Sequence, residues 1–235
     1  MNPLVHYVFA RADVPLPPLQ PGTLYEYVLA ANGVFVRGKR AGLEATIPVA
    51  RFPPAQTLRG LAPLEPSVRL LFPRVPAYLL AAMLEHARTT YDPTVFADLR
   101  NLLSAHHLNL PDPARWIEVL FDLDYTAAGW VLVIPAQIQA RDQVQVADMF
   151  DARHTRSLIH AHSHHVFAPT FSAQDNLDHT GFRLYAVLGY LATRPALRVR
   201  VGIYGYWLDV PAWTIFEEST EVRDAQDTQD AHADA

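Results

Sequence analysis

The residues best able to do chemistry lie between positions 160 and 175, where four histidines are followed by an aspartate. His162 and His164 are separated by one residue, so on a strand both side chains would point to the same face. Asp175 follows His164 after ten intervening residues, which allows a loop to bring its carboxylate back to the imidazoles. Three such ligands hold zinc and leave its fourth position open for water. The spacing therefore predicts a catalytic zinc site that performs hydrolysis.

A second histidine pair competes with this assignment. His160 and His162 have the same spacing, but the residue at the corresponding carboxylate position is Ala173. We therefore expect the later pair to bind the metal, and His160 and His165 to have supporting or packing roles. The alternative is that a histidine-rich stretch contains such pairs incidentally.

The elements around these residues can be predicted from local patterns. Residues 157–164 alternate in the manner of a strand that leads into a site. Ser172 is typical of a helix N-cap, and Asp175 occupies the third helical position, from which its side chain can bond back to the cap. We expect a strand, a loop and then a helix running from Ser172 to about Leu191.

The segments His162-Ser-His164 and Ser172-Ala-Gln-Asp175 resemble the JAMM motif of the JAB/MPN metalloprotease superfamily. That motif has an upstream Glu, then His-Ser-His-Pro, then Ser-x-x-Asp. The chain departs from it at two positions, with His165 in place of the usual Pro and Phe171 where Pro often precedes the Ser. The segments 130–137 and 201–207 make the chain similar to a plasmid-associated bacterial group called PRTRC system protein A.

The resemblance implies a glutamate at the start of an upstream strand as the general base. Glu118 lies at the head of a strand-like run over 117–125 and is the preferred candidate. Glu85 is the alternative, although it falls within a helical apolar pattern typical of a solvated helix face. Ser172 resembles the family serine that stabilises the oxyanion, and a role in N-capping alone is equally compatible.

The implied activity is that of a zinc-dependent peptidase or isopeptidase acting at the tail of a ubiquitin-like protein. The resemblance also implies a possible ThiF-like activating enzyme as a partner in the same system. A non-catalytic MPN-type scaffold is the competing function. Loss of catalysis usually removes a ligand, whereas His162, His164 and Asp175 are all present.

Composition limits the remaining classes of function. The chain of 235 residues is 50% hydrophobic, which suits one substantial core or two smaller ones. It has no cysteine, so zinc would be held by histidine and carboxylate alone. A net charge of −5 argues against nucleic acid as a partner. No apolar run reaches membrane-spanning length, and we expect a cytoplasmic protein without a membrane partner.

The predicted fold is α/β, with a JAB/MPN-like mixed β-sheet flanked by helices and preceded by a small β-rich unit. Asn32-Gly33 is a tight-turn signal between two apolar runs and predicts a hairpin, and a further strand is expected near 43–49. The expected domains are 1–72 for the β-rich unit, 73–217 for the metalloprotease domain and 218–235 for a disordered acidic tail. Within the second domain the expected elements are helices from 77 and over 94–103, and strands over 117–125, 129–139, 157–164, 197–207 and 212–217.

Overall fold

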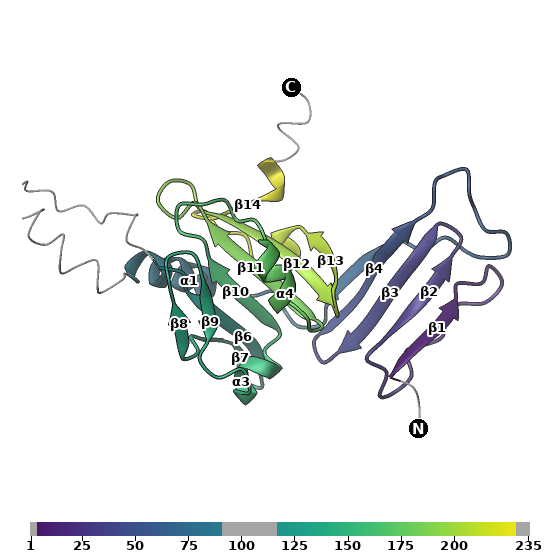
Figure 1. Ribbon diagram of the computed structural model, residues 1–235, viewed down its shortest axis with the longest axis horizontal. Coiled ribbons are helices and arrows are strands. Elements are labelled where there is room, and N and C mark those ends of the chain that lie inside the picture. The colour runs from purple at the N-terminus through teal and green to yellow at the C-terminus, as the bar shows by residue number, and fades with distance from the viewer. Residues whose placement is uncertain (1–3, 91–116, 229–235) are drawn as a thin grey trace, which may run out of the picture. The chain divides into compact units, whose positions relative to one another are not determined.

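The computed structural model describes residues 4–90 and 117–228 (Figure 1). These form two compact units whose segments are not contiguous in the chain. One unit holds residues 1–73, 172–185 and 200–210, and the other holds 74–171, 186–199 and 211–235. The predicted helix over 94–103, together with His106, His107 and Trp116, lies outside the described residues.

Residues 4–73 contain a five-stranded sheet in chain order (Figure 1). Its strands are β1 (Val5–Phe9), β2 (Tyr25–Ala30), β3 (Gly33–Arg40), β4 (Leu43–Arg51) and β5 (Ser67–Leu70). Strand β1 pairs parallel to β2, and the other neighbours are antiparallel. Alternate residues of β2 are buried, as expected for a strand with one face on a core. The predicted hairpin and the following strand are confirmed.

A seven-stranded sheet carries the histidine-rich segment. Its order is β13 (Tyr206–Val210), β12 (Ala196–Ile203), β11 (Arg183–Gly189), β10 (Ile159–Ser163), β6 (Leu120–Thr126) and β7 (Gly129–Val133), with β14 (Arg223–Asp224) paired parallel to β12. Strand β6 pairs antiparallel with both β10 and β7. Because strands of both directions and helices occur together, the mixed α/β class is confirmed, with strand predominating.

Helix α1 (Ala77–Thr89) begins where the sequence predicted a helix. Its buried residues Leu80, Met83, Leu84 and Ala87 recur at intervals of three and four, which places them on one helix face. His86 lies edge-on to Phe121 of β6, with ring centroids 6.0 Å apart. The apolar face of α1 therefore packs in the same core as the central strands.

Helix α4 (Ala173–Asp178) begins at the predicted N-cap but is much shorter than predicted. Residues 183–189, expected to be helical, instead form β11, in which all but the first residue are buried. A strand buried on both faces is a continuous apolar run without alternation, and such a run is easily mistaken for a helix. The prediction of a helix to residue 191 is therefore wrong.

Smaller differences follow from prolines and long-range pairing. The expected strand over 129–139 is divided at Pro135 into β7 and β8 (Gln137–Gln139), and β8 pairs with β9 (Val144–Val146). The expected strand over 212–217 is wrong, because Ala212–Thr214 is a 3-10 helix that follows Pro211. Residues 223–228 form β14 and a second 3-10 helix, so the chain is not without structure from residue 218. No helix among the described residues has the length and apolar character needed to cross a membrane.

Candidate metal centre

Strand β10 places the histidines within the seven-stranded sheet. It lies between β11 and β6, and His160 and His162 face Asp122 and Leu120 across the antiparallel pair. Ile159 and Ala161 point to the opposite face and are buried. The predicted strand is therefore confirmed, and its period of two presents His160 and His162 on the same face.

His162 and His164 point toward one another, with their Nε2 atoms 2.9 Å apart. The Nδ1 atom of His164 lies 3.0 Å from the carbonyl oxygen of Ala168. A carbonyl can only accept a hydrogen bond, so Nδ1 of His164 carries the proton and its Nε2 offers a lone pair. The loop that follows β10 thus selects the tautomer that a metal requires.

The loop over 165–171 is held by backbone hydrogen bonds to His164 and to Tyr190. The backbone N–H of Phe167 donates to the carbonyl oxygen of His164, and that of Tyr190 donates to the carbonyl oxygen of Phe167. His165 has a φ of 38°, in the left-handed region, and its side chain is buried. Burial lowers the pKa of His165 to about 4, so its imidazole is neutral near pH 7. This burial is compatible with the supporting or packing role expected for His165.

Ser172 and Asp175 form the predicted capping box at the start of α4. The Ser172 N–H donates to Oδ2 of Asp175 at 2.6 Å, and the Asp175 N–H donates to Oγ of Ser172 at 3.0 Å. The oxygen of Asp175 that takes part in this pair is Oδ2. Ligand atoms of His162, His164 and Asp175 all lie within 4.8 Å of one another.

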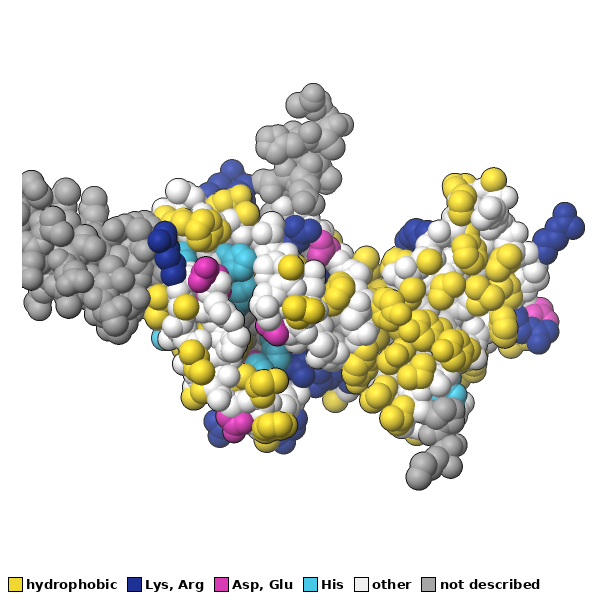
Figure 2. All heavy atoms as spheres, viewed as in Figure 1, with side chains coloured by type: hydrophobic (Ala, Val, Ile, Leu, Met, Phe, Trp, Pro, Cys, Tyr) yellow, Lys and Arg dark blue, Asp and Glu magenta, His cyan; other side chains and the backbone are white. Residues whose placement is uncertain are grey.

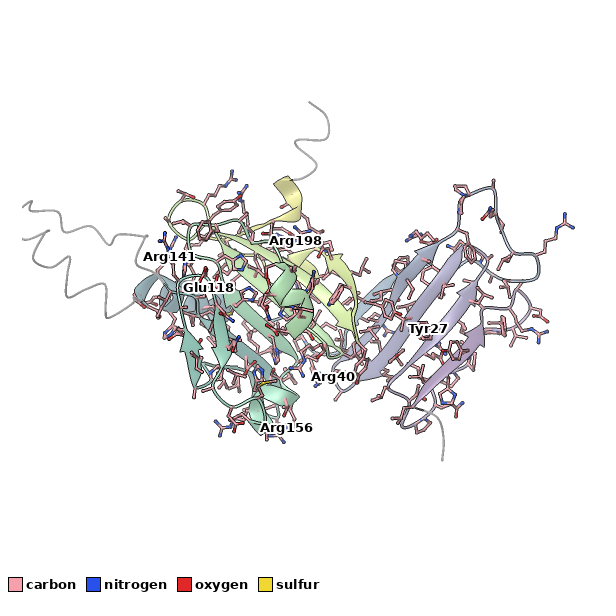
Figure 3. The ribbon with its side chains drawn as sticks, in the orientation of Figure 1. Tyr27, Arg40, Glu118, Arg141, Arg156 and Arg198 are labelled. Carbon is pink, nitrogen blue, oxygen red and sulfur yellow. The ribbon has the colours of Figure 1, made fainter. Side chains whose placement is uncertain are left out.

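Glu118 lies two residues before the start of β6 and is 6% exposed (Figure 3). Its Oε1 atom is 3.9 Å from Nε2 of His164. Its backbone is fixed from both sides, because its N–H donates to Ala140 and its carbonyl oxygen accepts from the Gln139 side chain. Glu85 is exposed on α1 and belongs to neither of the groups of metal-ligand type among the described residues. Among the ion pairs of the described residues, the predicted glutamate that lies beside the histidine pair is Glu118.

The donor set is suited to zinc. Two nitrogen ligands of a tetrahedral zinc ion lie about 3.3 Å apart, because each is 2.0–2.1 Å from the metal. The observed 2.9 Å between the Nε2 atoms requires only a small adjustment. Two imidazoles and a carboxylate also leave one tetrahedral position open, which is typical of catalytic zinc.

Sequence reasoning missed a second group of metal-ligand type, formed by Asp122, His154 and His160. It also missed Gln137, whose Oε1 accepts a 2.7 Å hydrogen bond from the N–H of Leu120 at the start of β6. Both depend on contacts between elements that are separate in sequence, which local patterns do not specify. The sequence feature that could have indicated the second group was the alternation of acidic and apolar residues in Phe121-Asp-Leu-Asp124.

No family model matches the chain, and no curated protein matches it.

Proposed function

We propose that this protein is a zinc-dependent peptidase of the JAMM type that hydrolyses an amide bond at the tail of a ubiquitin-like or related protein. The observation that carries the proposal is the convergence of His162 and His164 Nε2 beside the buried carboxylate of Glu118. The motif resemblance supplies the class of substrate.

In this proposal His162, His164 and Asp175 hold the metal. Zinc, when bound, supplies Lewis acidity toward a carbonyl oxygen and lowers the pKa of water at the site. The tautomer of His164 supports this ligand role, because its Nδ1 proton is engaged by Ala168. The same donors would suit a purely structural metal only if a fourth protein ligand were present.

Glu118 is the general base that takes a proton from water and passes it to the leaving nitrogen. Its carboxylate is 3.9 Å from a metal-facing atom of His164, close enough to act beside the ion without being a ligand of this set. Ser172 would donate its hydroxyl proton to the developing oxyanion. Its Oγ accepts from Asp175 in the capping box, so the hydroxyl proton is not used there.

The proposed substrate is an extended tail laid beside the sheet as an added strand, so that its scissile carbonyl reaches the histidine pair. A ThiF-like activating enzyme is the proposed partner in the same system. A zinc-loaded protein that binds such a tail without cleaving it would be a scaffold instead.

The deciding experiment compares Glu118→Gln with Glu85→Gln in a cleavage assay. The substrates are ubiquitin-like proteins encoded beside this gene, each joined through its tail to a reporter. Glu118→Gln should keep its zinc and lose cleavage by roughly 10²-fold or more, because a base is removed and no ligand is lost. Glu85→Gln, an exposed change of the same chemistry, should behave like the wild type. Loss of cleavage in Glu85→Gln alone would overturn the assignment.

A further inference from the structure

We propose that Asp122, His154 and His160 form a second binding site for a divalent transition-metal cation, separate from the candidate centre of His162 and His164. The proposal does not depend on peptidase activity. It rests on a buried carboxylate, two imidazoles that face it and the oxygen atoms that surround them.

Strand register brings the first two ligands together. Asp122 of β6 and His160 of β10 are direct partners across the antiparallel pair, so their side chains share one face. Nε2 of His160 is 3.3 Å from Oδ1 of Asp122. This separation matches the spacing of about 3.3 Å between two ligands of one tetrahedral zinc ion.

The third ligand comes from α3 (Ala152–Arg156), which follows β9. Nδ1 of His154 is 2.9 Å from Oδ2 of Asp122, and the two imidazole rings are stacked with centroids 4.2 Å apart. Asp151 caps this short helix by accepting from the N–H groups of Arg153 and His154. The cap therefore fixes the residue that carries the third ligand.

Two further oxygen atoms border the group. The carbonyl oxygen of His154 is 2.9 Å from Nε2 of His160 and 3.0 Å from Oγ of Ser157. Oγ of Ser157 is also 3.1 Å from Oδ1 of Asp122. A hydroxyl has a single proton and cannot donate to both oxygens at once. Because a carbonyl oxygen can only accept, Nε2 of His160 carries a proton in this arrangement, and a cation that binds there takes the place of that proton.

The charge of Asp122 gives the strongest argument. The residue is 2% exposed, and its partners among the described residues are the two imidazoles and the Ser157 hydroxyl. A buried carboxylate is costly unless a positive charge compensates it. An imidazole carries that charge only when protonated, whereas a divalent cation carries it whenever it is bound.

The donors select the kind of cation. Two imidazole nitrogens and one carboxylate favour zinc, cobalt, nickel or copper, whereas magnesium and calcium prefer sites composed of oxygen. An ion can reach the ligands from solvent, because the side chains of His154 and His160 are 14% and 15% exposed. Histidine side chains are visible at the surface of the part of the molecule that carries the seven-stranded sheet (Figure 2).

The two candidate sites share a strand face but no ligand. His160 and His162 are two residues apart on β10, which separates their Cα atoms by about 7 Å along the strand. Removing one ligand set should therefore leave the other in place. This allows each site to be counted separately in the full-length protein.

The experiment counts metal in the full chain with Zn²⁺, by elemental analysis, and with Co²⁺, by its visible absorption. The wild type should bind about two equivalents, and His162→Ala/His164→Ala about one. Adding His154→Ala to that double variant should remove the remaining equivalent. Adding Arg153→Ala instead, which changes an exposed residue on the same helix, should leave the remaining equivalent bound. Circular dichroism establishes that each variant is folded, and His154→Gln replaces His154→Ala if the latter is not.

The outcomes separate this proposal from the proposed function. The second site is supported if the His162→Ala/His164→Ala variant binds one equivalent of metal and the added His154→Ala change abolishes that binding. This result supports the site whether or not the wild type is a peptidase. Absence of Zn²⁺ and Co²⁺ binding in that folded double variant overturns it. Residual binding that is the same with and without His154 also overturns it. Loss of cleavage with both metals retained would instead count against the proposed peptidase.

Discussion

At the scale of single residues, Asp175 combines two tasks that substitution can separate. Its carboxylate caps α4 through the Ser172 N–H and is the proposed third metal ligand. Asp175→Asn keeps an oxygen that can accept from Ser172 but loses the negative charge. We expect zinc affinity to fall at least about 10-fold, because a loss of this size is seen even when a residue that hydrogen-bonds to a metal ligand is changed. The helix should remain folded. Competition with a zinc-chelating dye measures the first effect and circular dichroism the second.

Ser172→Ala should give the opposite pattern. It removes the hydroxyl that accepts from the Asp175 N–H, and loss of an N-cap costs about 1 kcal/mol of stability. The ligands remain, so zinc should be retained at wild-type stoichiometry. Urea unfolding and elemental analysis test the two statements. A variant that loses zinc without losing stability would contradict this division of roles.

The spacing of His162, His164 and Asp175 could be read from the sequence because all three lie within one short segment. A strand and a helix cap, both local patterns, bring them to the same region. Asp122 and His154 could not be found in this way. Their approach to His160 depends on the register between β6 and β10 and on a short helix, which local patterns do not specify.

At the scale of elements, the contact between β11 and the loop over 165–171 is the feature that positions the candidate centre. A Cβ atom added at Gly189 would lie 2.5 Å from the carbonyl oxygen of Phe167 and 2.6 Å from the nitrogen of Pro169. Both are backbone atoms, which cannot rotate away. The loop therefore approaches β11 at a distance that only glycine permits.

Gly189→Ala should displace this loop and with it the carbonyl of Ala168 that orients His164. We expect a loss of about 1–3 kcal/mol in stability, as for other overpacked sites, together with weaker zinc binding. Gly181→Ala is the control, because its added Cβ would meet the flexible side chain of Arg183 at 3.1 Å. Chemical unfolding and zinc competition measure both properties. Wild-type values for Gly189→Ala would show that the loop does not position His164.

The same elements mark where local prediction fails. The hairpin at Asn32 and helix α1 were predictable, because a turn signal and a helical apolar stripe are local patterns. Strand β11 was mistaken for helix because both of its faces are buried and its apolar residues do not alternate. Its identity depends on having β12 and β10 as neighbours.

At the scale of the whole molecule, chain order does not define the compact units. Each unit is assembled from segments that are far apart in sequence, and the late segment 211–235 belongs with residues that begin at Arg74. Arg74 donates to the carbonyl oxygen of Trp213, and the Ala77 N–H donates to the Glu217 side chain. The acidic composition after residue 218 predicted disorder, but composition does not report the pairing of Arg223 and Asp224 with β12.

Asp224 provides the test at this scale, because it is 2% exposed in a segment whose composition suggests a solvated tail. Its Oδ2 accepts from the N–H of Ala212 at 2.6 Å, and its Oδ1 accepts from the N–H of Gln226 at 2.9 Å. Asp224→Ala leaves the Ala212 N–H buried without this acceptor. Loss of such a partner costs about 1–3 kcal/mol.

We therefore expect Asp224→Ala to lower the free energy of unfolding, measured in urea, by that amount. Asp227→Ala, a change of the same kind at an exposed position three residues later, should remain close to the wild type. The difference between the two variants measures the buried bonds rather than the loss of a negative charge. Equal stabilities would show that β14 is not an integral strand, whereas the expected difference would make the C-terminal segment part of the folded core.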